Sequence, residues 1–430
     1  MSSYDTLVIG AGLAGLTTAN QLVQAGQKVL LIATGAGALL LASGCIDVLG
    51  FQPPDSGKPV KNPLDCVTNF LQDRPADHPY QQIGLGHIEA GLQAFLDLTE
   101  QAGLAYQGNA AKNWWLPSPA GAVHPTCLAP TSLANGELSQ GGTMLIVGFP
   151  QLRDFYPALI SQNLNAQVLG VTTTSAAVEL PPIPAADQMN VTPIELALAF
   201  EQTEFRQRVV QRLKPKIKNV DRIGFPAVLG LNRHHEVLGD LEEKLGKTVF
   251  EISTLPPSVP GRRLFERLRH LFVHHNGRLI LGSKVVDGTI ERQQVTRVHF
   301  ETANRLRSIQ AKNYVLATGG IYGGGLCTDA EGGLGRVWEP IFNLPIEANP
   351  NRHHWFAAKF LAPTGQPFAR FGLKVNDKLN PINAGGEPLA TNLYVAGATL
   401  AGTDWTQGRT GEGVALASAG KIAQQIIDGA

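Results

Sequence analysis

The sequence predicts an α/β protein with a Rossmann-type β-α-β fold and an inserted α+β cap or substrate domain. Three observations lead to this fold class. A buried strand runs into a glycine-rich turn near the N-terminus, prolines change the texture of the chain near residue 51, and two more strand-glycine motifs follow in the last third. Continuous apolar runs such as these are typical of parallel strands, which are buried on both faces.

The first 33 residues carry the complete β-α-β unit. Residues 6–9 form an apolar strand, and Gly10-x-Gly12-x-x-Gly15 follows directly. In this fingerprint Gly10 permits a tight turn, Gly12 lets a pyrophosphate approach the backbone, and Gly15 lets the next helix pack closely on the strand. A helical pattern of apolar residues and a second apolar strand complete the unit. The free N–H groups of the helix terminus predict a phosphate site.

The rest of the chain divides into two excursions and two further segments of the same fold. Prolines are frequent between residues 53 and 79, and a second group at 256–260 marks the exit of the first excursion. Within this excursion, helical patterns alternate with short strands expected at 143–147 and 221–224. We expect this division: first Rossmann segment, 1–50; inserted domain, 51–257; second segment, 258–340; second excursion, 341–385; C-terminal segment, 386–430.

Composition and charge exclude several classes of function. The 430 residues carry 35 basic and 35 acidic side chains, which argues against a nucleic-acid-binding protein. The four cysteines form no CxxC pair, so we expect no iron–sulfur cluster or metal site built from this chain, and a reducing, cytoplasmic setting is favoured. No apolar run reaches the roughly 18–20 residues of a membrane span.

Two later motifs repeat the strand-glycine pattern. One strand runs into Thr318-Gly319-Gly320, where the backbone can pass close to a cofactor. The strand of NLYVAGA (392–398) precedes a final helix, and this pair resembles the C-terminal flavin motif of flavoproteins with two dinucleotide-binding folds. The positive end of that helix would stabilise a reduced, anionic flavin. The candidate cofactor-binding residues are Gly10, Gly12, Gly15, Ser43, Gly44, Thr318, Gly319, Gly320, Gly397, Gly411, Glu412 and Gly413.

Two acidic residues that usually accompany these motifs are missing. The second strand ends at Ala33, where Asp or Glu normally binds the ribose of an adenine dinucleotide. Ala398 stands where the C-terminal flavin motif carries Asp. The departures make a full adenine dinucleotide less certain, whereas FMN has no such ribose.

Small and basic residues supply the other candidates. Ser43 and Gly44 lie in a small-residue segment that, in this class, commonly lies beside the isoalloxazine ring. Cys45 has no partner cysteine nearby, so it is expected to be a buried small residue rather than a redox thiol. The candidate catalytic residues are Arg352, His354 and Arg370, because Arg can bind a phosphate or carboxylate and His can move a proton.

Five motifs occur in one order along the chain: GAGLAG, ASGCIDVLG, TLPPSVPGRRL, YVLATGGIYGGGL, and NLYVAGA with GEGVALASAGKIA. As a set they resemble the B-subunit family of anaerobic glycerol-3-phosphate dehydrogenase over nearly the whole chain. The resemblance implies an FMN-binding subunit, with FAD as the alternative cofactor. The enzyme would be a quinone-linked dehydrogenase (EC 1.1.5.3) that oxidises sn-glycerol 3-phosphate to dihydroxyacetone phosphate, with fumarate or nitrate as terminal acceptor.

The resemblance also implies two partners. One is the FAD-bearing catalytic subunit, the A component of the enzyme, which would pair with this chain. The other is an iron–sulfur subunit, the C component, which would anchor the pair at the cytoplasmic face of the inner membrane. Whether the substrate is oxidised on this chain or on its FAD-bearing partner stays open.

Other hypotheses compete with this one. A fumarate-reductase-like FAD oxidoreductase suits the GEGVALASA ending, although the two missing acids count against it. A flavin-fold assembly subunit without a cofactor is supported by the same missing acids. A nicotinamide enzyme is disfavoured, because it would not need the C-terminal flavin motif.

Overall fold

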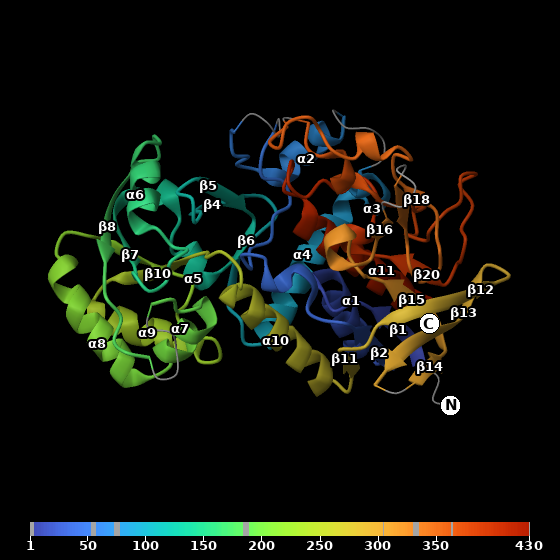
Figure 1. Cartoon of the computed structure of the whole chain (residues 1–430), viewed down its shortest axis with the longest axis horizontal. Helices are drawn as coiled ribbons and strands as arrows, with labels where there is room; N and C mark the ends of the chain where they lie inside the picture. Colours follow the sequence, from blue (N-terminus) through green and yellow to red (C-terminus); the bar gives the residue numbers. More distant parts are fainter. Residues whose placement is uncertain are drawn as a thin grey trace.

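The computed structural model shows two lobes joined near α10 (Figure 1). One lobe holds both termini, and the other is formed by the middle of the chain. The structure describes residues 4–52, 57–72, 78–183, 189–303, 305–329, 335–362 and 364–429.

A five-stranded parallel sheet forms the centre of the first lobe. The strands lie in the order β11-β2-β1-β15-β20, and every neighbouring pair is parallel. They are β1 (Tyr4–Ile9), β2 (Val29–Ala33), β11 (Arg278–Leu281), β15 (Ala311–Leu316) and β20 (Leu393–Val395). β2 is buried along its whole length, which explains its continuous apolar sequence. Strands from all three predicted segments thus share one sheet, and the predicted Rossmann-type fold is confirmed.

Four long helices pack beside this sheet: α1 (Leu13–Gln24), α4 (Leu85–Gln101), α10 (Val259–His274) and α11 (Gly411–Asp428). α1 contacts the other three, and α4 also contacts α10 and α11. Asn20 of α1 donates a hydrogen bond from Nδ2 to the Leu268 carbonyl of α10, at 3.1 Å. This bond ties the first segment of the fold to the second.

The helices that follow the proline run belong to the first lobe by their packing. They are α2 (Pro63–Gln72), α3 (Pro79–Ile83) and α4. Their side chains Val67, Tyr80 and Phe95 are part of the same buried cluster as the parallel sheet. The sequence predicts the start of the insert at residue 51, whereas this packing favours a start after α4. The prolines mark where the chain leaves the sheet, partly outside the described residues, but burial decides which lobe a helix joins.

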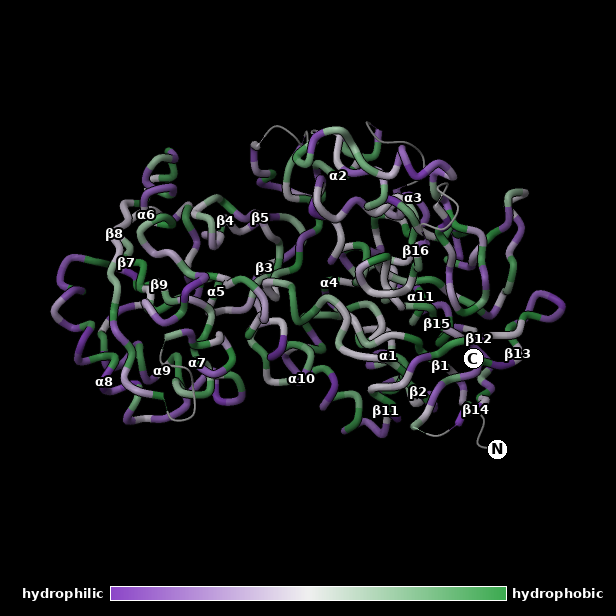
Figure 2. The backbone as a smooth tube through the Cα atoms, in the orientation of Figure 1, coloured by the Kyte–Doolittle hydropathy of each residue, from purple (hydrophilic) through white to green (hydrophobic). Residues whose placement is uncertain are grey.

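A four-stranded sheet, in the order β10-β9-β7-β8, forms the second lobe. Its strands are β7 (Gly142–Gly148), β8 (Val171–Ala177), β9 (Arg222–Pro226) and β10 (Thr248–Ile252). The helices around it are α6 (Pro157–Asn165), α7 (Pro193–Phe200), α8 (Thr203–Leu213) and α9 (His234–Leu245). This lobe has its own buried apolar cluster, and Figure 2 shows hydrophobic residues along its inner strands and hydrophilic ones around α8.

The second sheet is entirely parallel, which differs from the α+β pattern expected for the insert. β7 and β9 lie at the predicted strands, but β8 and β10 were not predicted. β8 is an edge strand whose residues VTTTSAA alternate between buried and exposed, so it lacks a continuous apolar run. Since α6 connects β7 to β8 and α9 connects β9 to β10, the lobe consists of β-α-β units.

Shorter elements complete the chain. An antiparallel meander is formed by β12 (Val285–Glu291), β13 (Gln294–Thr302) and β14 (Arg305–Ile309). Two antiparallel pairs, β3–β6 and β4–β5, come from β3 (Tyr106–Gly108), β4 (Trp114–Pro117), β5 (Val123–Thr126) and β6 (Leu128–Pro130), and α5 (Thr131–Ala134) follows. β16 (Cys327–Asp329) and β17 (Arg336–Trp338) form a pair just before the second excursion, and the excursion itself contains β18 (Ile346–Glu347) and β19 (Gly372–Leu373). Of the helices within the described ranges, none is long and apolar enough to span a membrane.

We expect Gly15→Ala to destabilise the chain, because the added Cβ would lie 1.9 Å from the Gly10 carbonyl oxygen. Overpacking of this kind costs about 1–3 kcal/mol, so thermal unfolding followed by circular dichroism should show a lower midpoint. Gly239→Ala in α9 is the matched control, because its added Cβ meets no atom within 4 Å. That variant should keep or raise the midpoint. An unchanged midpoint for Gly15→Ala would contradict the close contact.

Candidate functional site

The three glycine motifs meet at one edge of the five-stranded sheet. Because the sheet is parallel, β1, β15 and β20 all end at this edge. Gly10 has a φ of +109°, and a Cβ added to it would lie 2.2 Å from the Ala317 carbonyl oxygen. The first motif therefore packs directly against the start of the second. Only glycine satisfies both the positive φ and the close approach of the Ala317 carbonyl at this position.

Gly12 lies at the open side of this turn. It precedes α1 in an extended conformation, and neither a side-chain cap nor an acidic residue occupies the first turn of the helix. A Cβ added to Gly12 would meet nothing within 4 Å. Space and helix N–H groups therefore coincide here, as a pyrophosphate requires.

The second motif touches the third. Gly319 donates its N–H to the Thr399 hydroxyl at 3.0 Å, and a Cβ on Gly320 would lie 3.1 Å from the Ala398 carbonyl oxygen. The Thr318 hydroxyl oxygen is buried and has no hydrogen-bond partner among the described residues. A buried hydroxyl without a partner is costly, so Thr318 fits a site where a bound group completes the hydrogen bonding.

Gly397 connects the third motif to two helices. Its φ is +68°, its added Cβ would lie 3.1 Å from the Ala14 side chain of α1, and its N–H donates to the Ser418 hydroxyl of α11 at 3.0 Å. The predicted cofactor-binding glycines of all three motifs are thus neighbours in space.

Ser43 and Gly44 lie on a segment between the two lobes. The Ser43 hydroxyl accepts the Cys45 N–H at 3.2 Å, and the Gly44 carbonyl accepts a hydrogen bond from the Tyr106 hydroxyl at 2.7 Å. Burial raises the pKa of the Cys45 thiol well above its usual value. Cys45 is therefore held as a neutral thiol, in agreement with its interpretation as a buried small residue.

Sequence reasoning did not find the charged group beside this segment, which we call the Asp47 cluster: Asp47, His124 and Arg409. His124 Nε2 lies 2.8 Å from Asp47 Oδ2 and 3.1 Å from Oδ1. Arg409 Nη1 lies 3.5 Å from Asp47 Oδ2. Asp47 and His124 are both buried. Asp47 stands within the ASGCID segment, but nothing in the sequence around His124 indicates its partner.

The Asp47 cluster abuts the start of α11. The Gly413 N–H donates to the Asp47 carbonyl at 3.0 Å, and Gly411 and Gly413 flank Glu412 in the first turn. A Cβ on Gly413 would lie 2.1 Å from the Tyr80 hydroxyl, so glycine is required for this approach. Of the sequence candidates Gly411, Glu412 and Gly413, Gly413 therefore contacts Asp47 directly.

The two carboxyl groups at this helix end differ in protonation. Burial, and then the negative charge of Asp47, raise the pKa of Glu412 to about 8. Burial opposes ionisation of Asp47 too, but the His124 ring and the Arg409 guanidinium hold the pKa of Asp47 below its usual value. At neutral pH the site thus contains one carboxylate and one neutral carboxylic acid, an arrangement typical of acid–base sites.

The predicted catalytic residues Arg352, His354 and Arg370 come from the second excursion. Arg352 and His354 are exposed in a short 3-10 helix (Arg352–His354) of the second excursion. Arg370 Nε lies 3.8 Å from Asp404 Oδ2, in the loop that precedes α11. No ion pair among the described residues connects these three side chains with Asp47, so their catalytic role stays a prediction.

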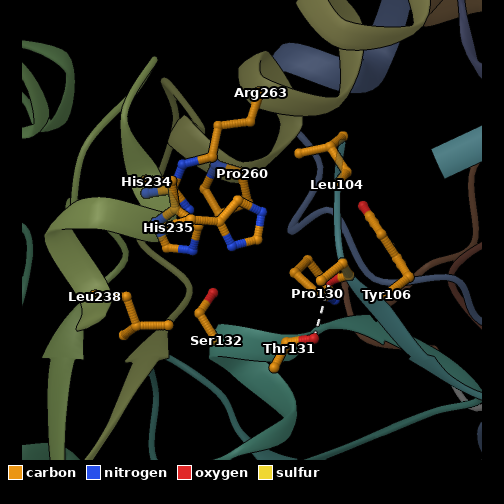
Figure 3. A pocket seen from close by; sticks show the side chains of 11 residues that line it. Leu104, Tyr106, Pro130, Thr131, Ser132, His234, His235, Leu238, Pro260 and Arg263 are labelled. Carbon is orange, nitrogen blue, oxygen red and sulfur yellow. Dashed lines mark hydrogen bonds between the residues drawn. The ribbon is translucent and has the colours of Figure 1, made fainter. Parts of the chain in front are cut away.

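A small pocket between the lobes is lined by residues outside the glycine motifs and the Asp47 cluster. Figure 3 shows His234, His235 and Ser132 pointing into it, with Arg263 above them. It measures about 60 Å³, and none of the predicted site residues lines it. Burial lowers the pKa of His234 to about 4, so the ring is neutral. Across the described ranges, no group of three or more His, Cys, Asp or Glu side chains could hold a metal ion.

Glu412→Gln should remove part of the pH dependence of stability. With a folded-state pKa of about 8 against 4.5 for the ordinary group, Glu412 stays protonated in the folded chain while the unfolded chain ionises. Its stabilising contribution is complete below pH 4.5 and is lost as the pH rises through 8. Thermal midpoints from pH 5 to 9 should therefore fall further for wild type than for Glu412→Gln. The surface control Glu100→Gln should follow wild type, and a pH-independent difference for Glu412→Gln would contradict a protonated Glu412.

Comparisons with known proteins identify the family to which this fold belongs. Residues 5–414 match the model of the FAD binding domain family. The match confirms the expectation of a flavin-binding fold, but it favours FAD and gives no support to FMN. Among solved structures, the chain is similar to a 3-ketosteroid delta1-dehydrogenase from Sterolibacterium denitrificans, with a TM-score of 0.49, 11% identity and full coverage of both chains.

Two curated relatives match almost end to end. The chain is 32% identical over 432 residues to the B subunit of the anaerobic glycerol-3-phosphate dehydrogenase of Pectobacterium atrosepticum, covering 99% of this chain and 98% of the relative. It is also 32% identical to a probable B subunit of this enzyme from Halobacterium salinarum, covering 98% of each. With matches of this extent, the chain belongs to the FAD binding domain family and, within it, to the B-subunit family of anaerobic glycerol-3-phosphate dehydrogenase.

Proposed function

We propose that this chain is the flavin-binding subunit of an anaerobic dehydrogenase that oxidises sn-glycerol 3-phosphate to dihydroxyacetone phosphate. The names of its relatives supply the substrate class. The enzyme passes the electrons to quinone, with fumarate or nitrate as terminal acceptor. The chain works with an FAD-bearing partner and with an iron–sulfur partner, which holds the complex at the cytoplasmic face of the inner membrane.

One observation carries the cofactor part of this proposal. At the glycine edge, an open space at Gly12 lies at an uncapped helix terminus, and the buried Thr318 hydroxyl has no partner among the described residues. Gly10 and Gly12 would hold the pyrophosphate, Thr318 would donate to or accept from the cofactor, and the first turn of α11 would face the flavin ring. A bound flavin supplies a two-electron acceptor.

FAD is the better candidate for that flavin, although Ala33 cannot bind its ribose. The Ala33 carbonyl already accepts the N–H groups of Gly282 and Ser283, at 2.8 and 3.2 Å. The ribose hydroxyls must therefore bind other groups at the end of β2, and the family match outweighs the missing acid. Of the three candidate substrate residues, Arg370 is the best placed, because its contact with Asp404 brings it to the loop before α11.

The test is the identity and amount of flavin released by acid from the purified chain, alone and with its partners. Gly12→Val should lower the flavin content at least about tenfold, because a side chain would occupy the phosphate space. Since nothing lies within 4 Å of its added Cβ, the variant should still fold. Gly239→Val, equally unobstructed at its Cβ, is the matched control and should keep its flavin.

The outcomes separate the hypotheses. FAD at near one per chain supports the proposal, whereas FMN would restore the expectation from the missing acids. A folded Gly12→Val variant with full flavin content would contradict the placement of the site. Absence of flavin from wild type in every preparation would favour the cofactor-free assembly role. Oxidation of succinate in place of glycerol 3-phosphate would favour the fumarate-reductase-like alternative.

A further inference from the structure

Asp47 and His124 form a buried hydrogen-bonded pair that uses only one of the two ring nitrogens of His124. His124 uses Nε2 for Asp47, at 2.8 Å, and no described residue makes a hydrogen bond to Nδ1. The His124 side chain keeps 11% of its surface exposed. When Nε2 carries the proton donated to Asp47, Nδ1 has a free lone pair that can accept another proton.

A structural carboxylate in the same chain has different surroundings. Glu251 is buried and binds the Arg263 guanidinium through both oxygens, at 2.7 and 3.0 Å. It also accepts from the Ser132 hydroxyl and the Leu229 N–H. This saturation is what a purely structural buried charge requires. The Asp47–His124 pair, in contrast, leaves one ring nitrogen available.

Arg409 is held beside the pair by an unusual backbone. It is a non-glycine residue with a φ of +50°, a conformation that is unfavourable for a side-chain-bearing residue and often occurs at functional sites. A Cβ on Gly50 would come within 2.8 Å of the Arg409 side chain. The Arg409 side chain is 39% exposed, so its charge reaches both Asp47 and solvent. The backbone conformation of Arg409 and its packing on Gly50 thus keep the guanidinium beside Asp47.

The position of the pair matches a reacting centre. The Asp47 carbonyl binds the first turn of α11, the helix end that the C-terminal motif directs at the flavin. With a flavin bound so that its ring faces this helix end, the pair would lie beside the ring rather than beside the phosphates. A phosphorylated alcohol entering this site would meet the Arg409 guanidinium, which suits an anionic group.

We propose that His124 accepts the hydroxyl proton of the phosphorylated secondary alcohol during its oxidation, and that Asp47 positions the His124 ring. This inference rests on the proposed function. In the step, the O–H bond breaks and its proton passes to His124 Nδ1; a flavin bound at this site would be the two-electron oxidant that takes the hydride of the broken C–H bond. The carbon–oxygen double bond forms, the alcohol loses two electrons, and Asp47 stabilises the imidazolium that results.

The kinetic test measures anaerobic reduction of the bound flavin by glycerol 3-phosphate in a stopped-flow spectrometer. His124→Gln should slow the reduction by about 10²–10⁴-fold, while flavin content, reduction by dithionite and binding of dihydroxyacetone phosphate stay near wild type. Loss of the proton acceptor should also make the rate rise with pH, as hydroxide replaces it. Asp47→Asn, the positioning variant, should show a smaller loss in rate.

A matched control exists in the meander. His299 Nδ1 lies 3.1 Å from Asp287 Oδ2, so His299→Gln removes a histidine–aspartate pair distant in sequence from the Asp47 cluster. This control should reduce its flavin at the wild-type rate. Equal rates for His124→Gln and wild type would overturn the inference.

A second measurement does not depend on turnover. Diethylpyrocarbonate labelling of the holoprotein, read by peptide mass spectrometry, should modify His124, and dihydroxyacetone phosphate should protect it. The exposed His353 is the positive control. An unlabelled His124 beside a labelled His353 would overturn the inference, as would labelling without protection in a chain whose flavin the substrate reduces. If glycerol 3-phosphate does not reduce the wild-type flavin, the proposed function fails, and labelling alone decides whether His124 is an available proton acceptor.

Discussion

The start of α1 lies so close to the end of β1 that a Cβ on Gly15 would come within 1.9 Å of the Gly10 carbonyl oxygen. This approach is possible only without a side chain, and the rest of the site depends on it. It fixes Gly10 against Ala317 of the second motif, and it places Ala14 where Gly397 rests on it. Three segments that are far apart in sequence therefore share one frame, and the helix terminus at Gly12 opens into the space that they leave.

At the start of α11, the two carboxyl groups of Asp47 and Glu412 differ in charge. Asp47 has two cationic or hydrogen-bonding partners, so ionisation is favoured despite burial, whereas Glu412 faces the negative charge of Asp47 and stays protonated. A neutral carboxyl in the first turn of α11 can donate a hydrogen bond, and the neighbouring carboxylate can hold an imidazolium. The same helix terminus thus offers both a donor and an anion, each of which a dehydrogenase site can use.

Sequence patterns predicted the local features well and the long-range ones poorly. The strand-glycine motifs at Gly10, Thr318 and Gly397 are readable because each is a contiguous run whose backbone needs are met by neighbouring residues. Edge strand β8 escaped prediction because its exposed face is polar. His124 escaped because its role comes from a partner 77 residues away, and no residue near it in sequence signals that contact. The packing of α4 on α11 in the first lobe is long-range in the same way, since no pattern within α4 indicates its partner helix.

The proton acceptor and its partner come from different parts of the chain, so the site depends on how the lobes are held together. His124 lies on β5, next to a small buried cluster that joins Cys45 and Leu116 to the residues around α5. Between the two lobes, Arg263 of α10 also binds Glu251 of β10 through both carboxylate oxygens. Removing one partner of a buried pair costs about 3–5 kcal/mol. The saturated Arg263–Glu251 pair therefore ties β10 of the second lobe to α10 of the first, and its loss should loosen the contact between the lobes.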